Sequence, residues 1–94
     1  MVNVMIKAKV KDQATWKQSF EAAGALRKSY GSLGVHAYAA ADNPNEIIIF
    51  GEFQDVNKAK EMFQSAEFRE VTQKAGLVAP PEVTYLAEVV KLPA

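Results

Sequence analysis

Two neighbouring side chains in this sequence, His36 and Tyr38, have the chemistry for proton transfer. His36 is the only histidine, and histidine is the side chain whose ordinary pKa suits general acid–base catalysis near neutral pH. Tyr38 lies two residues further along an extended segment, so both side chains point to the same face of a strand. The pair could deprotonate a phenol or protonate an intermediate. The alternative is that both are polar residues at a sheet edge or an interface, without a catalytic role.

A positive charge falls within an otherwise apolar helical stripe. The stripe has spacings of three and four residues and consists of Trp16, Phe20, Ala23, Arg27 and Tyr30. A guanidinium stays charged at any working pH and is costly to bury without a partner. Arg27 could therefore anchor an anion or a phenolate in a cavity between this helix and the sheet. Alternatively, its stem packs on the helix and its charge reaches water near the helix C-terminus.

Composition argues against several other kinds of site. The 94 residues contain no cysteine and one histidine, so disulfides, thiolate chemistry, iron–sulfur clusters and zinc or copper sites are not expected. We therefore expect no metal and no cofactor. The segment Gly31-Ser32-Leu33-Gly34 lacks the preceding strand and following helix that a phosphate-binding loop needs.

Charge and hydropathy argue against nucleic-acid and membrane partners. Eleven acidic and eleven basic residues balance, so no net field attracts nucleic acid or anionic lipid. No apolar run approaches the roughly 20 residues that cross a bilayer. The first residues lack the basic region and long apolar segment of a secretory signal, so we expect a cytoplasmic protein. The length predicts a single domain over residues 1–94.

Hydrophobic periodicity predicts the strands that position these side chains. Alternating apolar residues predict strands over 2–10, 33–41 and 82–90. The run Ile47-Ile48-Ile49-Phe50 predicts a strand that is apolar on both faces, which is typical of the centre of a covered sheet. The turn residues 42–45 predict a hairpin between the second and third strands.

Helical periodicity and capping residues predict the helices. The stripe around Arg27 predicts one helix over 13–30, capped by Asp12 and ended by Gly31. A second helical segment follows Asp55, is divided by a new cap at Ser65, and ends at Gly76.

The order of elements, βαββαβ, predicts an α+β ferredoxin-like fold. We expect a four-stranded antiparallel sheet with the first and third strands in the centre and the helices on one face. The other face also carries apolar side chains, and a second copy packed sheet to sheet would cover it. The sequence therefore predicts a homodimer formed through the sheet face.

The order of landmarks along the whole chain resembles a known superfamily. They are Trp16 and Phe20, Arg27, Gly34, the turn 42–45 before an apolar strand, Phe53-Gln54-Asp55, Ala59 and Phe63, Ser65, Ala75-Gly76, and Pro80-Pro81. The chain resembles the dimeric α+β barrel superfamily, and within it the small antibiotic-biosynthesis-monooxygenase-like or cyclase-like proteins. This resemblance implies a dimer. As activities it implies cofactor-free oxygenation of phenolic polyketides, haem degradation or polyketide cyclisation.

Two classes of function follow from the residues and the resemblance. The first is an enzyme without a cofactor, in which a small aromatic or phenolic molecule is deprotonated and then meets dioxygen or is cyclised. Its site would lie between the first helix and the sheet, with His36 and Tyr38 as catalytic groups. The second is a non-catalytic dimeric module that binds a small apolar molecule or only a partner. A cavity that holds His36, Tyr38 or Arg27 would favour the enzyme. The expected substrate-binding residues are Arg27, Trp16, Tyr30 and Phe63.

Overall fold

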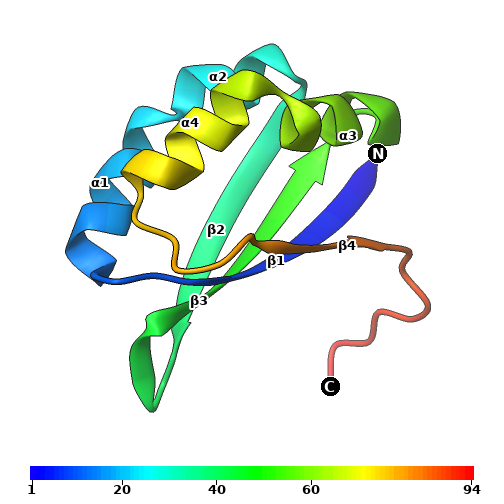
Figure 1. Cartoon of the computed structure of the whole chain (residues 1–94). Helices are drawn as coiled ribbons and strands as arrows, with labels where there is room; N and C mark the ends of the chain where they lie inside the picture. The colour runs from blue at the N-terminus through cyan, green and yellow to red at the C-terminus, as the bar shows by residue number, and fades with distance from the viewer.

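A computed structural model describes residues 1–94 and has four strands and four helices. The sheet is antiparallel with the strand order β2-β3-β1-β4, and the helices lie on one of its faces (Figure 1). The predicted α+β ferredoxin-like fold, with the first and third strands in the centre, is confirmed. The elements are β1 (Val2–Lys9), α1 (Gln13–Ala22), α2 (Gly24–Ser29), β2 (Ser32–Ala40), β3 (Asn43–Phe53), α3 (Val56–Gln64), α4 (Ala66–Lys74) and β4 (Glu82–Leu86).

The apolar face of the sheet that lies under the helices forms the core. In the central strand β3, Ile47 and Ile49 are buried, and Ile6 of β1 pairs directly with Ile49. Successive strand side chains alternate between faces, so Ile48 and Phe50 point to the face without helices. The prediction that β3 is apolar on both faces is confirmed, and the second apolar face has no cover within one chain.

The predicted single helix over 13–30 is wrong, because the chain breaks it at Ala23 into α1 and α2. Ala23 has φ −86° and ψ 8°, outside the helical range. Gly24 follows it, and glycine lowers helix propensity by roughly 1 kcal/mol relative to alanine. At the break, the carbonyl of Phe20 accepts a hydrogen bond of 2.7 Å from Nη1 of Arg27 and a longer one of 3.3 Å from the N–H of Ala23. The stripe's only charged residue therefore caps the broken helix.

The predicted helix caps and ends are confirmed. The side chains of Asp12, Asp55 and Ser65 accept hydrogen bonds from backbone N–H groups in the first turns of α1, α3 and α4. Hydrogen bonds from Thr15 lower the pKa of Asp12. Gly31 has a φ of 82°, a conformation that favours glycine after a helix.

Some strand boundaries differ from the prediction. The turn between β2 and β3 is shorter than expected, because β2 runs to Ala40 and β3 already starts at Asn43. The last strand ends at Leu86 rather than at residue 90. Leu86 pairs with Asn3, so only Val2 of the first strand remains to pair with anything beyond it. The C-terminal residues 87–94 leave the sheet (Figure 1), and Val89 is 95% exposed.

Candidate functional site

A small cavity lies between the helices and the sheet and is called the inner cavity below. Its volume is about 70 Å³, and 15 of its 20 lining residues are hydrophobic. Residues of β1, β2 and β3 form its floor and residues of all four helices form its walls. The polar side chains that line it are Arg27, Ser32 and Thr72.

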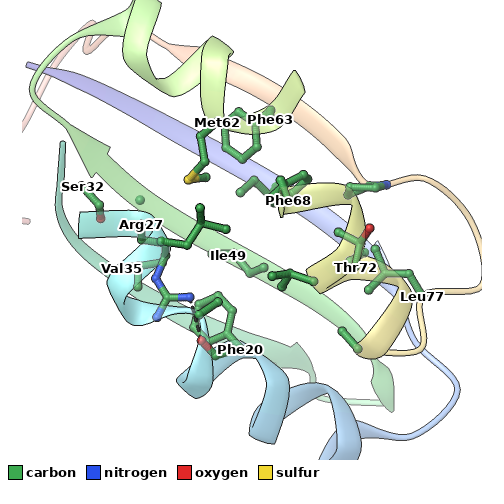
Figure 2. Close-up of a pocket in the computed structure, with 18 of the residues that line it drawn as sticks. Phe20, Arg27, Ser32, Val35, Ile49, Met62, Phe63, Phe68, Thr72 and Leu77 are labelled. Carbon is green, nitrogen blue, oxygen red and sulfur yellow. Dashed lines mark hydrogen bonds between the residues drawn. The ribbon is translucent and has the colours of Figure 1, made fainter. Parts of the chain in front are cut away.

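Arg27 is the only charged residue of the inner cavity. It is half-buried, and its guanidinium carbon lies 4.2 Å from the centre of the Phe20 ring. Burial lowers the pKa of the guanidinium from its ordinary value, yet an arginine remains protonated at any working pH. One N–H bonds the carbonyl of Phe20, and Figure 2 shows the guanidinium among the lining side chains. A guanidinium has five N–H donors, so donors remain for an anion or an oxygen of a ligand.

The wall behind Arg27 is aromatic. Trp16 is 7% exposed and stacks on Phe20, with ring centroids 4.8 Å apart and planes 24° apart. Arg27, Phe20 and Trp16 therefore form a continuous layer of flat groups from α2 to α1. Such a layer offers a planar aromatic ligand one face for stacking and one cation for an oxygen.

The remaining polar groups lie toward opposite ends of the cavity. Ser32 lies on the same side as Arg27, whereas Thr72 lies at the far end beside Leu77 (Figure 2). The hydroxyl of Thr72 donates a 2.9 Å hydrogen bond to the carbonyl of Arg69, so its oxygen can only accept from a ligand. The cavity thus presents donors at one end and an acceptor at the other.

The structure does not bring His36 and Tyr38 into the inner cavity. His36 pairs with Phe50 and Tyr38 pairs with Ile48, which places both on the face of the sheet away from the helices. The rings of His36, Tyr38 and Phe50 contact one another there, with centroids 5.5–6.2 Å apart. The inner cavity therefore includes Arg27 but not His36 or Tyr38, which line a separate hollow between α1 and β2. A catalytic role for these two residues stays a prediction, and it would require a ligand in that hollow or on the open face.

The expected substrate-binding residues divide in the same way. Trp16, Arg27 and Phe63 line the inner cavity, whereas Tyr30 does not. Tyr30 packs instead against a second apolar cluster that includes Val4.

Ser32, Thr72 and several apolar lining residues were not expected at a site. Thr72 carries the only signal in the sequence that could have identified one of them, because it is a hydroxyl within the apolar stripe of α4. Ser32 could not have been identified, since its position in the cavity lining depends on how α2 packs relative to the start of β2.

Two further properties of the described residues bear on function. No group of three or more His, Cys, Asp or Glu side chains comes together in a way that could hold a metal ion. None of the helices has the length and apolar character needed to cross a bilayer.

Comparison with solved structures identifies proteins of the same shape. A Bordetella bronchiseptica protein, provisionally assigned as an antibiotic biosynthesis monooxygenase, has a TM-score of 0.82 and 19% identity over 95% of this chain and 97% of its own. SnoaB, a cofactor-independent oxygenase from Streptomyces nogalater, has a TM-score of 0.80 and 14% identity over 99% of this chain and 97% of its own. The chain has the same α+β ferredoxin-like fold as these proteins.

A third protein of this fold was solved with a ligand. The ActVA-Orf6 monooxygenase of Streptomyces coelicolor, in complex with nanaomycin D, has a TM-score of 0.68 and 21% identity over 99% of this chain and 92% of its own. No family model and no curated protein matches the sequence. The resemblance expected from the landmark residues is thus confirmed at the level of the fold, over essentially the whole chain.

Proposed function

We propose that the inner cavity binds a small aromatic molecule as its phenolate or enolate, and that the protein acts on it as a cofactor-independent oxygenase. The observation that carries this proposal is the half-buried guanidinium of Arg27 in a cavity whose lining has no carboxylate. A partly buried cation without a carboxylate partner is stabilised by a bound anion, so the site is suited to a negative charge. The likeness in fold to SnoaB, described as a cofactor-independent oxygenase, supports the same class of reaction.

Arg27 would act by stabilising the ionised ligand. A bound phenol or enol loses its proton to water, because the cavity lining contains no histidine, aspartate or glutamate to accept it. The resulting carbanion adds to dioxygen, and loss of water from the hydroperoxide converts a CH₂ group into a carbonyl group. One dioxygen is consumed and one water is formed for each ligand oxidised. The aromatic layer of Trp16 and Phe20 would hold the ring in place.

The size of the inner cavity limits how a ligand enters it. A volume of about 70 Å³ holds only a few water molecules, whereas sites for drug-sized ligands measure roughly 300–1,000 Å³. An aromatic ligand must therefore displace lining side chains. Met62 is the most adaptable of them, because its unbranched thioether side chain adopts many shapes.

Binding of 2-naphthol and of its methyl ether, measured by calorimetry, tests the role of Arg27. Arg27→Gln should weaken 2-naphthol binding by at least about tenfold, the scale of a lost charge-assisted hydrogen bond, and should change binding of the ether much less. The bound naphthol should ionise at a lower pH than free naphthol, since the cation favours the phenolate. Lys28→Gln is the matched control, because Lys28 is an exposed cation of the same helix outside the cavity.

Oxygen consumption with an anthrone as substrate tests the reaction. Arg27→Gln should lower the rate by at least about tenfold, and Lys28→Gln should leave it unchanged. Ligand binding without oxygen uptake would favour the alternative, a non-catalytic binding module. Loss of turnover in His36→Ala with normal turnover in Arg27→Gln would move the chemistry to the open face of the sheet and contradict the proposal.

A homodimer through the open sheet face is part of the same proposal. That face carries Ile48, Phe50, His36 and Tyr38, and Tyr38 is 57% exposed in the single chain. A second copy would cover these groups and would leave the inner cavity of each chain complete.

A further inference from the structure

A second hollow adjoins the inner cavity at its Thr72 end and is called the outer hollow below. It lies between α4 and the segment 77–81, is open to solvent and has a volume of about 460 Å³. Five residues line both spaces: Phe63, Phe68, Thr72, Leu77 and Pro81. These shared side chains separate the two spaces, so a ligand too long for the inner cavity would reach the outer hollow by displacing them.

The outer hollow carries one charged side chain, Arg69. Its other polar side chains are Thr72 and Gln73, and the rest are apolar. Another hollow adjoins the inner cavity on the side of α1 and β2, but Lys17 and Glu21 balance their charges there. The stacked rings of Trp16 and Phe20 also lie between that hollow and Arg27. A third hollow shares Val35 and Gly51 with the inner cavity, and it carries the carboxylates of Glu52 and Glu88. Of these neighbouring hollows, the one at α4 alone has an uncompensated positive charge.

The walls of the outer hollow are fixed by backbone contacts. The N–H of Val78 donates to the carbonyl of Lys9 at 3.0 Å, and Leu77 forms a bridge with Val10. Pro80 and Pro81 then limit the backbone freedom of the next residues. A hollow whose walls are already fixed binds a ligand at a lower entropic cost than one that must be ordered.

We infer that the outer hollow is a subsite for an anionic substituent, such as a carboxylate, on the ligand whose aromatic body occupies the inner cavity. This inference rests on the proposed function and specifies its substrate class. The ligand has an ionisable hydroxyl at Arg27 and an acidic group at Arg69, at opposite ends of a flat apolar body. Thr72 lines both spaces, and because its hydroxyl hydrogen is donated to the carbonyl of Arg69, its oxygen can accept a hydrogen bond from a donor group in the middle of the ligand.

Three rigid probes separate the two ends of the site: 6-hydroxy-2-naphthoic acid, its methyl ester, and 6-methoxy-2-naphthoic acid. The acid–ester pair reports on Arg69, and the hydroxyl–methoxy pair reports on Arg27. Affinities are measured by calorimetry for the full chain and for Arg27→Gln, Arg69→Gln and Lys74→Gln. Lys74 is the matched control, because it is an exposed cation of α4 that does not line the outer hollow.

The wild-type chain should bind the acid about threefold more tightly than the ester at low salt, the scale expected for an exposed charge pair. Arg69→Gln should abolish this preference, Lys74→Gln should keep it, and high salt should weaken it. If Arg69→Gln still binds the acid more tightly than the ester, the inference is wrong. It is also wrong if only Arg27→Gln loses this difference, because the carboxylate would then lie at Arg27.

The same measurements keep the two proposals apart. In one outcome, tighter binding of the hydroxyl probe than of the methoxy probe depends on Arg27, but the acid binds no more tightly than its ester. This result supports the proposed function and contradicts the outer subsite. In another outcome, tighter binding of the acid than of its ester depends on Arg69, but Arg27→Gln changes no affinity. This result supports the outer subsite and contradicts the phenolate anchor. If the wild-type chain binds none of the three probes, both fall.

Discussion

At the scale of single residues, the side chain that decides the interpretation is Arg27. The same guanidinium caps the carbonyl of Phe20, covers the Phe20 ring and faces the inner cavity. The two readings that the sequence left open, a ligand anchor and a residue at a helix end, therefore do not exclude each other. The cap fixes the position of the guanidinium, and the donors that the cap does not use remain for a ligand.

Trp16 tests whether the aromatic layer belongs to the core. The side chain is 7% exposed and packs in a buried cluster with Ile47 and Ile49, so Trp16→Ala should destabilise the fold by roughly 3–5 kcal/mol. For a domain of this size the melting temperature should fall by more than about 10 °C. Lys17→Ala, at the exposed neighbouring position, should change stability by no more than about 0.5 kcal/mol. A Trp16→Ala variant that melts within a degree of the wild type would remove Trp16 from the core.

At the scale of elements, the caps were predictable because each depends on a few adjacent residues. Asp12, Asp55 and Ser65 start helices through bonds within three residues of themselves. The break at Ala23 was not predictable, because periodicity continues across it and the arginine that bonds the carbonyl of Phe20 lies seven residues further along the chain.

The same distinction applies to the site: residues on one helix could be grouped from the sequence, whereas residues on different elements could not. Arg27 and Trp16 were found because they share one helical stripe. Their separation from His36 could not be predicted from the sequence, because a strand pattern gives two faces without saying which one the helices cover.

The stability of the protein should change in opposite directions when alanine replaces the glycine that begins α2 and the glycine that follows it. At Gly24 an added methyl would lie 3.8 Å from the Arg27 guanidinium, an ordinary contact, and the backbone is not in the left-handed region. Gly24→Ala should therefore stabilise the protein by roughly 0.4–1 kcal/mol. Gly31 has a φ of 82°, so Gly31→Ala should destabilise it by about 1–2 kcal/mol. Chemical denaturation measures both, and a loss of stability in Gly24→Ala would show that α2 depends on the glycine.

At the scale of the whole molecule, the chain covers one face of its sheet and leaves the other open (Figure 1). The covered face holds the core and the inner cavity, whereas the open face carries an aromatic cluster of His36, Tyr38 and Phe50. Apolar surface of this kind on a sheet is expected to be buried against a partner.

Assembly through the open face is the last prediction. Ile48 is a central residue of that face, and an aspartate there would place a charge inside any sheet-to-sheet contact. Wild-type protein should sediment as a dimer at micromolar concentration, and Ile48→Asp should sediment as a monomer or aggregate. Gln18→Asp, which adds the same charge to an exposed position of α1, should remain a dimer. Wild-type protein that sediments as a fully stable monomer would show instead that the apolar residues of this face tolerate water, and the paired-sheet assembly would have to be given up.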